Sequence, residues 1–219
     1  MSHLGKLLSR SLSVPGLAPL LLRVRTSNPL ILMYHGIGGD EPPSGLNSLE
    51  AKHIPGAIFI PTADFYNKKG VVTDLAPAEQ IAASLGKAGV KQTDTIVFYD
   101  DSGSLSATRA VWSLDVYGHK DSRVLNGTWT SWDAAKKPAT KDVPTRAATQ
   151  YAFSGAPNTS IVVTMDQMVK AVGDPSKIVC DSRTADEYTG RDLRAPAKNG
   201  GHVPGALNLA YSDAVAKTV

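Results

Sequence analysis

The chain contains one short motif twice. Residues 53–57 read His-Ile-Pro-Gly-Ala, and residues 202–206 read His-Val-Pro-Gly-Ala. An internal repeat of this kind indicates two copies of one supersecondary unit. A long stretch of chain follows the first copy, whereas the sequence ends at Val219 soon after the second. We therefore expect one full unit and a second unit that is cut short.

Segments with strand character alternate with segments of helical character. Runs rich in β-branched and aromatic residues predict the strands, and segments with one apolar helical face predict the helices. The predicted strands are 30–34, 57–60, 95–99, 123–125, 177–180 and 207–209. The predicted helices are one from Pro77 to a cap at Gly89, then 107–116, 165–172 and 185–188. This alternation predicts an α/β fold with a parallel sheet flanked by helices.

Composition divides the chain into four parts. Residues 1–28 form a basic leader, and 29–134 form the first predicted domain. Lys, Pro, Thr, Ala and Ser dominate 135–160, which predicts an interdomain linker. The remaining segment, 161–219, is predicted to be a partial second domain.

The leader resembles a targeting segment. Its four basic residues precede Asp40, the first acidic residue, and account for the net charge of +3; they are Lys6, Arg10, Arg23 and Arg25. Several serines and a leucine-rich helical face complete the pattern. Basic, Ser-rich, acid-poor amphipathic leaders are typical of mitochondrial transit segments. We expect a mitochondrial location, with the cytoplasm as the alternative.

Several classes of site and partner are not indicated. One cysteine excludes an intramolecular disulfide and a cysteine-cluster metal site. The five histidines form no metal-binding pattern, and no cofactor motif is present. No apolar run reaches the roughly 20 residues that a membrane-spanning helix needs. No basic stripe with interleaved aromatics suggests nucleic acid.

Four segments together resemble the tandem rhodanese-domain sulfurtransferases, which include thiosulfate and 3-mercaptopyruvate sulfurtransferases. The segments are the paired Pro-Gly motifs, Ile96 to Asp101, Val124 to Gly127 with Trp132, and Asp181 to Gly190. The resemblance implies a rhodanese-like domain with a parallel sheet flanked by helices, followed by a partial second rhodanese-like domain. In this family the first domain is silent, and a loop cysteine of the second domain carries sulfur as a persulfide.

The resemblance implies that the catalytic loop is missing. In the first domain Asp100 stands at the position of the cysteine, and a carboxylate cannot carry sulfur. In the second domain, the spacing from His53 to Asp100 carried over to His202 falls well beyond Val219. We therefore expect no catalytic residue in this chain.

Other candidates have structural interpretations. Cys180 falls inside a predicted strand, where a cysteine is usually a small buried hydrophobe. His53 and His202 recur in both units, one of them silent, which favours a role in the turn and its packing. A carboxylate, Glu187, stands where some family members place a substrate-binding arginine, and it would repel an anionic donor.

Three arginines are weak candidates for binding an anionic sulfur donor. Arg183 follows a predicted strand and is expected to form a local salt bridge. Arg191 and Arg194 belong to a basic loop that could face a donor or simply be solvated. Lys198 belongs to the same basic loop.

Two functional hypotheses remain open. In the first, the chain is a non-catalytic structural or binding subunit of a mitochondrial assembly. A protein partner would then cover the open edges and apolar faces of the incomplete second domain. In the second, the chain is a fragment of an active thiosulfate or 3-mercaptopyruvate sulfurtransferase.

Overall fold

The computed structural model describes residues 30–35, 52–67, 74–194 and 197–214. For 30–35 the backbone alone is described. The chain divides into two compact units, residues 1–158 and 159–219, called unit 1 and unit 2 below. The predicted leader lies outside the described residues. Within the described residues, no helix has the length and apolar character needed to cross a membrane.

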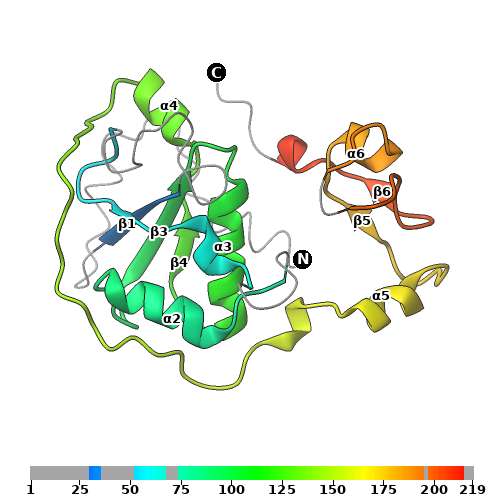
Figure 1. The fold of residues 1–219 in the computed structure, drawn as a ribbon, viewed down its shortest axis with the longest axis horizontal. Helices are drawn as coiled ribbons and strands as arrows, with labels where there is room; N and C mark the ends of the chain where they lie inside the picture. The colour runs from blue at the N-terminus through cyan, green and yellow to red at the C-terminus, as the bar shows by residue number, and fades with distance from the viewer. Residues whose placement is uncertain (1–29, 36–51, 68–73, 195–196, 215–219) are drawn as a thin grey trace. The chain divides into compact units, whose positions relative to one another are not determined.

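Unit 1 contains a four-stranded parallel sheet in the order β2-β1-β3-β4 (Figure 1). The strands are β1 (Leu30–His35), β2 (Ile58–Phe59), β3 (Thr95–Asp100) and β4 (Ser122–Val124). Each lies at a position predicted from sequence, with no end shifted by more than one residue. The prediction of a parallel α/β sheet is therefore confirmed.

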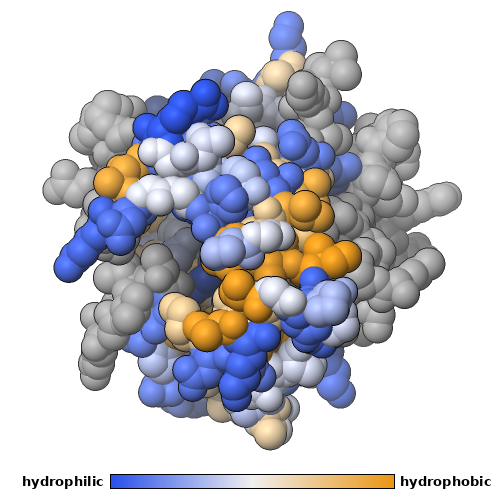
Figure 2. Space-filling model, turned by 90° about the vertical axis from the view of Figure 1, so that its right-hand side faces the viewer, coloured by the Kyte–Doolittle hydropathy of each residue, from blue (hydrophilic) through white to orange (hydrophobic). Residues whose placement is uncertain are grey.

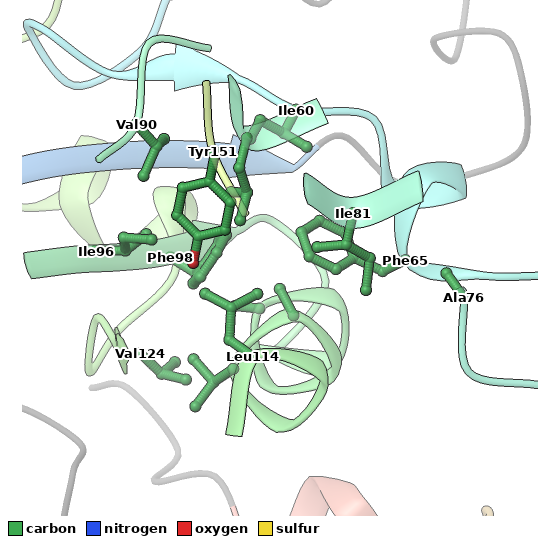
Figure 3. Close-up of a cluster of buried hydrophobic side chains, with 14 residues drawn as sticks. Ile60, Phe65, Ala76, Ile81, Val90, Ile96, Phe98, Leu114, Val124 and Tyr151 are labelled. Carbon is green, nitrogen blue, oxygen red and sulfur yellow. The ribbon is translucent and has the colours of Figure 1, made fainter. Parts of the chain in front are cut away.

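The central strand β3 is buried on both faces, as expected for a parallel sheet covered on both sides. Ile96 and Phe98 point into the larger apolar cluster, which α2 (Ala78–Lys87) and α3 (Leu105–Tyr117) complete (Figure 3). The alternate side chains, Val97 and Tyr99, join a smaller cluster on the other face. Because side chains alternate between the two buried faces, the consecutive residues Ile96–Tyr99 are all apolar or aromatic.

The smaller cluster reveals a helix that the sequence pattern did not predict. Trp129 and Trp132 pack against it from α4 (Trp129–Ala134), a short helix directly after β4. The first Pro-Gly motif supplies Ile54 and Ala57 to the same cluster. The motif and the tryptophans therefore cover the same face of the sheet.

The two ends of α2 lie close to the predicted positions, with the start shifted by one residue. Pro77 is the residue before α2 rather than its first residue, and it has an extended backbone. Gly89 follows α2 in the left-handed conformation (φ 73°), as predicted for a C-terminal cap. Its N–H bonds to the Gly86 carbonyl at 3.0 Å.

The predicted linker forms contacts that its composition did not reveal. From Ala135 to Asn158 the chain has no helix or longer strand, and it runs along unit 1 as an extended segment, here called the strap. The Thr149 N–H donates to the Gly86 carbonyl at 2.9 Å, and the Tyr151 ring enters the larger cluster. A Cβ on Gly86 would lie 2.7 Å from the Thr149 oxygen, so this approach requires glycine.

Unit 2 contains a two-stranded parallel sheet and two short helices. Its elements are α5 (Met165–Ala171), β5 (Cys180–Asp181), α6 (Ala185–Thr189) and β6 (Leu207–Asn208). Both helices begin with a capping box, formed by Thr164 with Gln167 in α5 and by Thr184 with Glu187 in α6. Their starts are therefore fixed by local hydrogen bonds.

Unit 2 buries little apolar surface. Among the described residues of unit 2, Ala206 is the only hydrophobic residue that is buried. Ile178 is 78% exposed and Leu207 60%. Figure 2 shows hydrophobic side chains gathered on the face turned toward the viewer. The prediction that the strands near Ile178 and Leu207 expose apolar side chains is confirmed.

The prediction that Cys180 is a buried hydrophobe is wrong, because its side chain is exposed. The prediction rested on the usual environment of a strand cysteine, which lies between two neighbouring strands and under a helix. Among the described residues, β5 pairs with β6 alone.

Candidate functional site

The structure shows how the Asp100 side chain is held. Asp100 ends β3 and is 1% exposed. Its Oδ1 accepts hydrogen bonds from the N–H groups of Ser102 (3.0 Å) and Ser104 (2.8 Å), and its Oδ2 accepts one from Ala107 (2.9 Å). The loop and the first turn of α3 thus form a cradle of three N–H groups around one carboxylate.

The backbone of the loop explains this convergence. Gly103 and Ser104 both have left-handed conformations, with φ of 69° and 67°. A non-glycine residue rarely adopts this conformation, so Ser104 is a position of local strain. The turn directs successive N–H groups inward, at the positive end of the 13-residue helix α3. This geometry suits an anion.

Chemically, the cradle is an anion site that the chain fills by itself. In a sulfur-transfer site, N–H groups of this kind stabilise a thiolate nucleophile and lower its pKa. A carboxylate is equally well held, but it forms no persulfide. The prediction placed Asp100 at this position; the three N–H donors have no signature in the sequence except Gly103, which indicates a tight turn.

Tyr99 attaches the first Pro-Gly motif to the same strand. Its hydroxyl oxygen accepts a hydrogen bond from the Ile54 N–H at 3.1 Å. Burial raises the pKa of the Tyr99 hydroxyl well above its usual value, so it remains protonated. The motif is thus tied to the strand that ends in Asp100.

The two motif histidines contact backbone carbonyls. The His53 ring lies 3.1 Å from the Asp142 carbonyl oxygen, on the strap. The His202 ring stacks on Tyr188, with centroids 3.7 Å apart, and its Nδ1 lies 2.8 Å from the Tyr188 carbonyl oxygen. These contacts agree with a packing role for both residues.

The three candidate arginines lie in unit 2, and each is paired with a carboxylate. Arg183 forms a 2.6 Å ion pair with Asp181 and donates to the Gly201 carbonyl. Arg191 pairs with Asp186 at 2.5 Å, and Arg194 with Asp192 at 3.0 Å and Glu187 at 3.4 Å. Their charges are therefore locally compensated, and the local salt bridge predicted for Arg183 is present.

Glu187 has a structural role in addition to its charge. One of its oxygens accepts hydrogen bonds from the N–H (2.9 Å) and the hydroxyl (2.8 Å) of Thr184. These bonds keep the pKa of the Glu187 carboxyl below its usual range. The carboxylate thus caps α6 at the place where some family members have an arginine.

A second buried polar group lies between the sheet and the strap. His119 is 5% exposed, with Nδ1 2.8 Å from the Tyr151 hydroxyl and Nε2 3.1 Å from the Asp94 carbonyl oxygen. Burial lowers the pKa of His119, and the carbonyl contact opposes this shift. The neutral ring therefore joins the strap to the end of α3.

No cluster of three or more metal-ligating side chains occurs in the ranges that the structure describes. Cys180 lies on β5, directly before Asp181, and is not the first residue of a helix. The described residues thus bring only Asp100 into a cradle of N–H groups.

Comparison with known proteins shows which domain family this chain resembles. Residues 41–135 match the rhodanese-like domain family. A putative thiosulfate sulfurtransferase of Saccharopolyspora erythraea is 34% identical over 171 residues, which cover 74% of this chain and 58% of that protein. The thiosulfate sulfurtransferase of Gallus gallus is 31% identical over 164 residues, covering 74% and 56%.

The chain contains a rhodanese-like domain. Solved structures show the same fold: Tum1 of Saccharomyces cerevisiae has a TM-score of 0.73 at 20% identity, covering 87% of this chain and 66% of Tum1. SseA of Escherichia coli, a 3-mercaptopyruvate sulfotransferase by its description, has a TM-score of 0.69 at 22% identity, covering 86% and 72%. The predicted rhodanese resemblance and the fold of parallel strands flanked by helices are confirmed, and the partial second domain stays a prediction.

The rhodanese-family relatives are longer than the aligned region. The chain spans between 56% and 58% of the length of the two curated relatives named above. The activity, substrates and partners of this chain are therefore matters for proposal.

Proposed function

We propose that this 219-residue chain transfers no sulfur by itself and acts as a non-catalytic, partner-binding member of the rhodanese family. One observation carries the proposal: the Asp100 carboxylate occupies the N–H cradle of unit 1. Sulfane sulfur transfer needs a thiolate at such a position, because the thiolate attacks the donor and holds the sulfur as a persulfide.

Cys180, the single cysteine, does not replace the missing nucleophile. Its thiol is exposed on a two-residue strand. No helix N-terminus follows it directly, since Asp181 to Arg183 separate it from the Thr184 cap of α6. The features that activate a catalytic thiol are therefore absent around it within the described part of unit 2.

A second candidate function is favoured by the relatives. They are named thiosulfate sulfurtransferases, and this chain spans between 56% and 58% of their length. The chain would then supply the silent domain of a longer enzyme that passes sulfane sulfur to a thiophilic acceptor. The intact mass of the native protein separates the two candidates: a mass of 23.1 kDa, or a smaller mass after removal of the leader, supports the first, and a larger mass supports the second.

A cyanide-dependent assay tests the absence of activity. The purified 219-residue chain, incubated with thiosulfate and cyanide, is expected to form no thiocyanate above the protein-free background. Cys180→Ser is the matched control and should behave identically. Thiocyanate formation that disappears in Cys180→Ser would contradict the proposal and make Cys180 the sulfur carrier.

The proposal includes a mitochondrial location, supported by the basic, acid-poor composition of residues 1–28. Fused to a fluorescent protein, this leader is expected to direct the fusion to mitochondria in a eukaryotic cell. A matched fusion with Arg10, Arg23 and Arg25 changed to glutamine should remain in the cytoplasm, because transit segments depend on their basic residues. Cytoplasmic fluorescence from the unchanged leader would favour the alternative location.

A further inference from the structure

His119 lies where the strap meets the rest of unit 1. It follows the C-terminus of α3 and is 5% exposed. Its Nε2 lies 3.1 Å from the carbonyl oxygen of Asp94, in the turn before β3. Its Nδ1 lies 2.8 Å from the hydroxyl of Tyr151, a strap residue whose ring enters the larger apolar cluster (Figure 3). One imidazole ring thus contacts both sides of this boundary.

These contacts determine which nitrogen of His119 carries the hydrogen. A carbonyl oxygen only accepts, so Nε2 donates to Asp94, and Nδ1 of the neutral ring accepts from the Tyr151 hydroxyl. Burial raises the pKa of Tyr151, so the hydroxyl keeps its hydrogen. A proton added to Nδ1 would force this hydroxyl to accept, and its own hydrogen would have no acceptor among the described residues.

A cavity beside this contact opens to solvent. It has a volume of about 380 Å³ and is lined by residues 92–94, by residues 118–121 and by the strap residues Tyr151, Phe153 and Ser154. His119 and Tyr151 both belong to this lining. A proton can therefore reach the His119 ring while unit 1 stays folded.

Charged groups surround His119 on each neighbouring element. Asp94 lies in the turn before β3, Lys120 and Asp121 lie in the turn before β4, and Arg146 lies on the strap. Both carboxylates already have partners: Arg146 pairs with Asp94 at 3.8 Å, and a neighbouring arginine pairs with Asp121 at 2.8 Å. Burial lowers the pKa of His119, and the two aspartates oppose this shift without cancelling it.

We propose that His119 is an acid-sensitive switch for the strap: proton uptake at Nδ1 breaks the bond that the Tyr151 hydroxyl donates and releases residues 149–158 from unit 1. The charged ring then turns to water, and the Tyr151 side chain leaves the cluster with the segment. The proposal concerns how the chain leaves unit 1. It does not depend on whether the protein transfers sulfur.

Few other bonds hold the released segment. The Thr149 N–H donates to the Gly86 carbonyl at 2.9 Å, and the Asn158 N–H donates to the Val116 carbonyl at 2.7 Å. The earlier part of the strap has its own attachment, because the backbones of His53 and Thr140 exchange two hydrogen bonds of 2.9 Å. Release can therefore stay confined to the later part of the strap.

The direction of the pH effect follows from the two environments of His119. In the detached state the ring meets water, where the pKa of histidine is about 6.5. Because burial lowers the pKa of His119 in the attached state, the detached state binds the proton more tightly. The attached strap is therefore most stable above about pH 6.5. Below this value the ratio of detached to attached molecules rises by up to about tenfold per pH unit, until the pKa of the attached state is reached.

Amide hydrogen exchange, followed by NMR on the purified 219-residue chain, measures the release. The reporters are the N–H groups of Thr149 and Asn158. Between about pH 7 and about pH 5.5, their protection, corrected for intrinsic exchange rates, is expected to fall about fivefold. The Leu125 N–H, bonded to the Phe98 carbonyl at 2.8 Å in the sheet, is the reference and should keep its protection.

Two variants identify the group that takes the proton. His119→Gln keeps an N–H donor for the Asp94 carbonyl but cannot become charged, so the protection of both reporters should be lower throughout and independent of pH. Asp94→Asn removes one carboxylate that opposes the shift and still accepts from the Lys91 N–H, bonded at 3.0 Å. This variant should lose more protection in acid than the unchanged protein.

Each contrary outcome has a distinct meaning. Equal acid sensitivity in His119→Gln, or its disappearance in Asp94→Asn, assigns the proton to a different group and overturns the proposal. A parallel loss of protection at Leu125 means that unit 1 unfolds as a whole, which also overturns it. If His119→Gln fails to fold, Asp94→Asn decides between the two groups.

Discussion

Asp100→Ala is expected to lower the free energy of unfolding of unit 1 by about 4 kcal/mol. The substitution removes the acceptor of three backbone N–H groups, each bonded at 3.0 Å or less. A hydrogen bond to a charged group contributes about 1.5–3 kcal/mol, and a buried donor without an acceptor adds a penalty of about 1–3 kcal/mol. The expected loss is smaller than the sum of these contributions, because water can enter the space left by the carboxylate and accept hydrogen bonds from the N–H groups.

Urea unfolding followed by tryptophan fluorescence measures this loss in unit 1 alone. The three tryptophans, Trp112, Trp129 and Trp132, all lie in that unit. Asp100→Asn is the matched control: it keeps the shape and one acceptor oxygen but turns a donor toward the remaining N–H groups, so an intermediate loss is expected. A loss below about 1 kcal/mol for alanine would mean that the cradle does not depend on the carboxylate.

Tyr151→Ala is expected to cost unit 1 about 3–5 kcal/mol, the range for truncating a buried aromatic side chain. Tyr151 is 8% exposed and packs edge-on against Phe153, with ring centroids 5.2 Å apart. Its loss would also leave His119 Nδ1 without its hydroxyl partner. Equilibrium unfolding in urea measures the change.

The conservative variant separates the two contributions of Tyr151. Tyr151→Phe keeps the ring in the core and removes only the hydroxyl, so a loss of about 1–2 kcal/mol is expected. Equal losses for phenylalanine and alanine would assign the whole effect to the hydrogen bond. No loss for alanine would mean that the strap contributes little to the stability of unit 1.

The sequence predicted the unit 1 sheet well, because its strands are strongly patterned. The segment Thr95–Tyr99 is β-branched and aromatic throughout, and β3 lies there with both faces buried. The position of Asp100 was predicted by the same strand and the family resemblance. The cradle itself was not predictable, since backbone N–H groups have no residue code and only Gly103 indicates the turn.

The sequence was misleading where tertiary contacts decide the outcome. The helix α4 is six residues long, too short for a clear helical period, and only its tryptophans stood out. Cys180 has an ordinary strand pattern, yet its exposure depends on which neighbours β5 has. Arg191 and Arg194 were interpreted as a basic loop, because their pairing with Asp186 and Asp192 depends on the geometry of the folded chain.

The strap determines where the first unit can be cut. Helix α4 ends at Ala134, and a domain boundary placed there on the basis of composition would exclude the 24 residues of the strap. Those residues supply Tyr151 to the core, and Asn158 still donates its N–H to the Val116 carbonyl at 2.7 Å. A gene fragment that stops after α4 would thus encode a protein with a cavity in its hydrophobic core. A fragment that stops after Asn158 would encode the whole of unit 1.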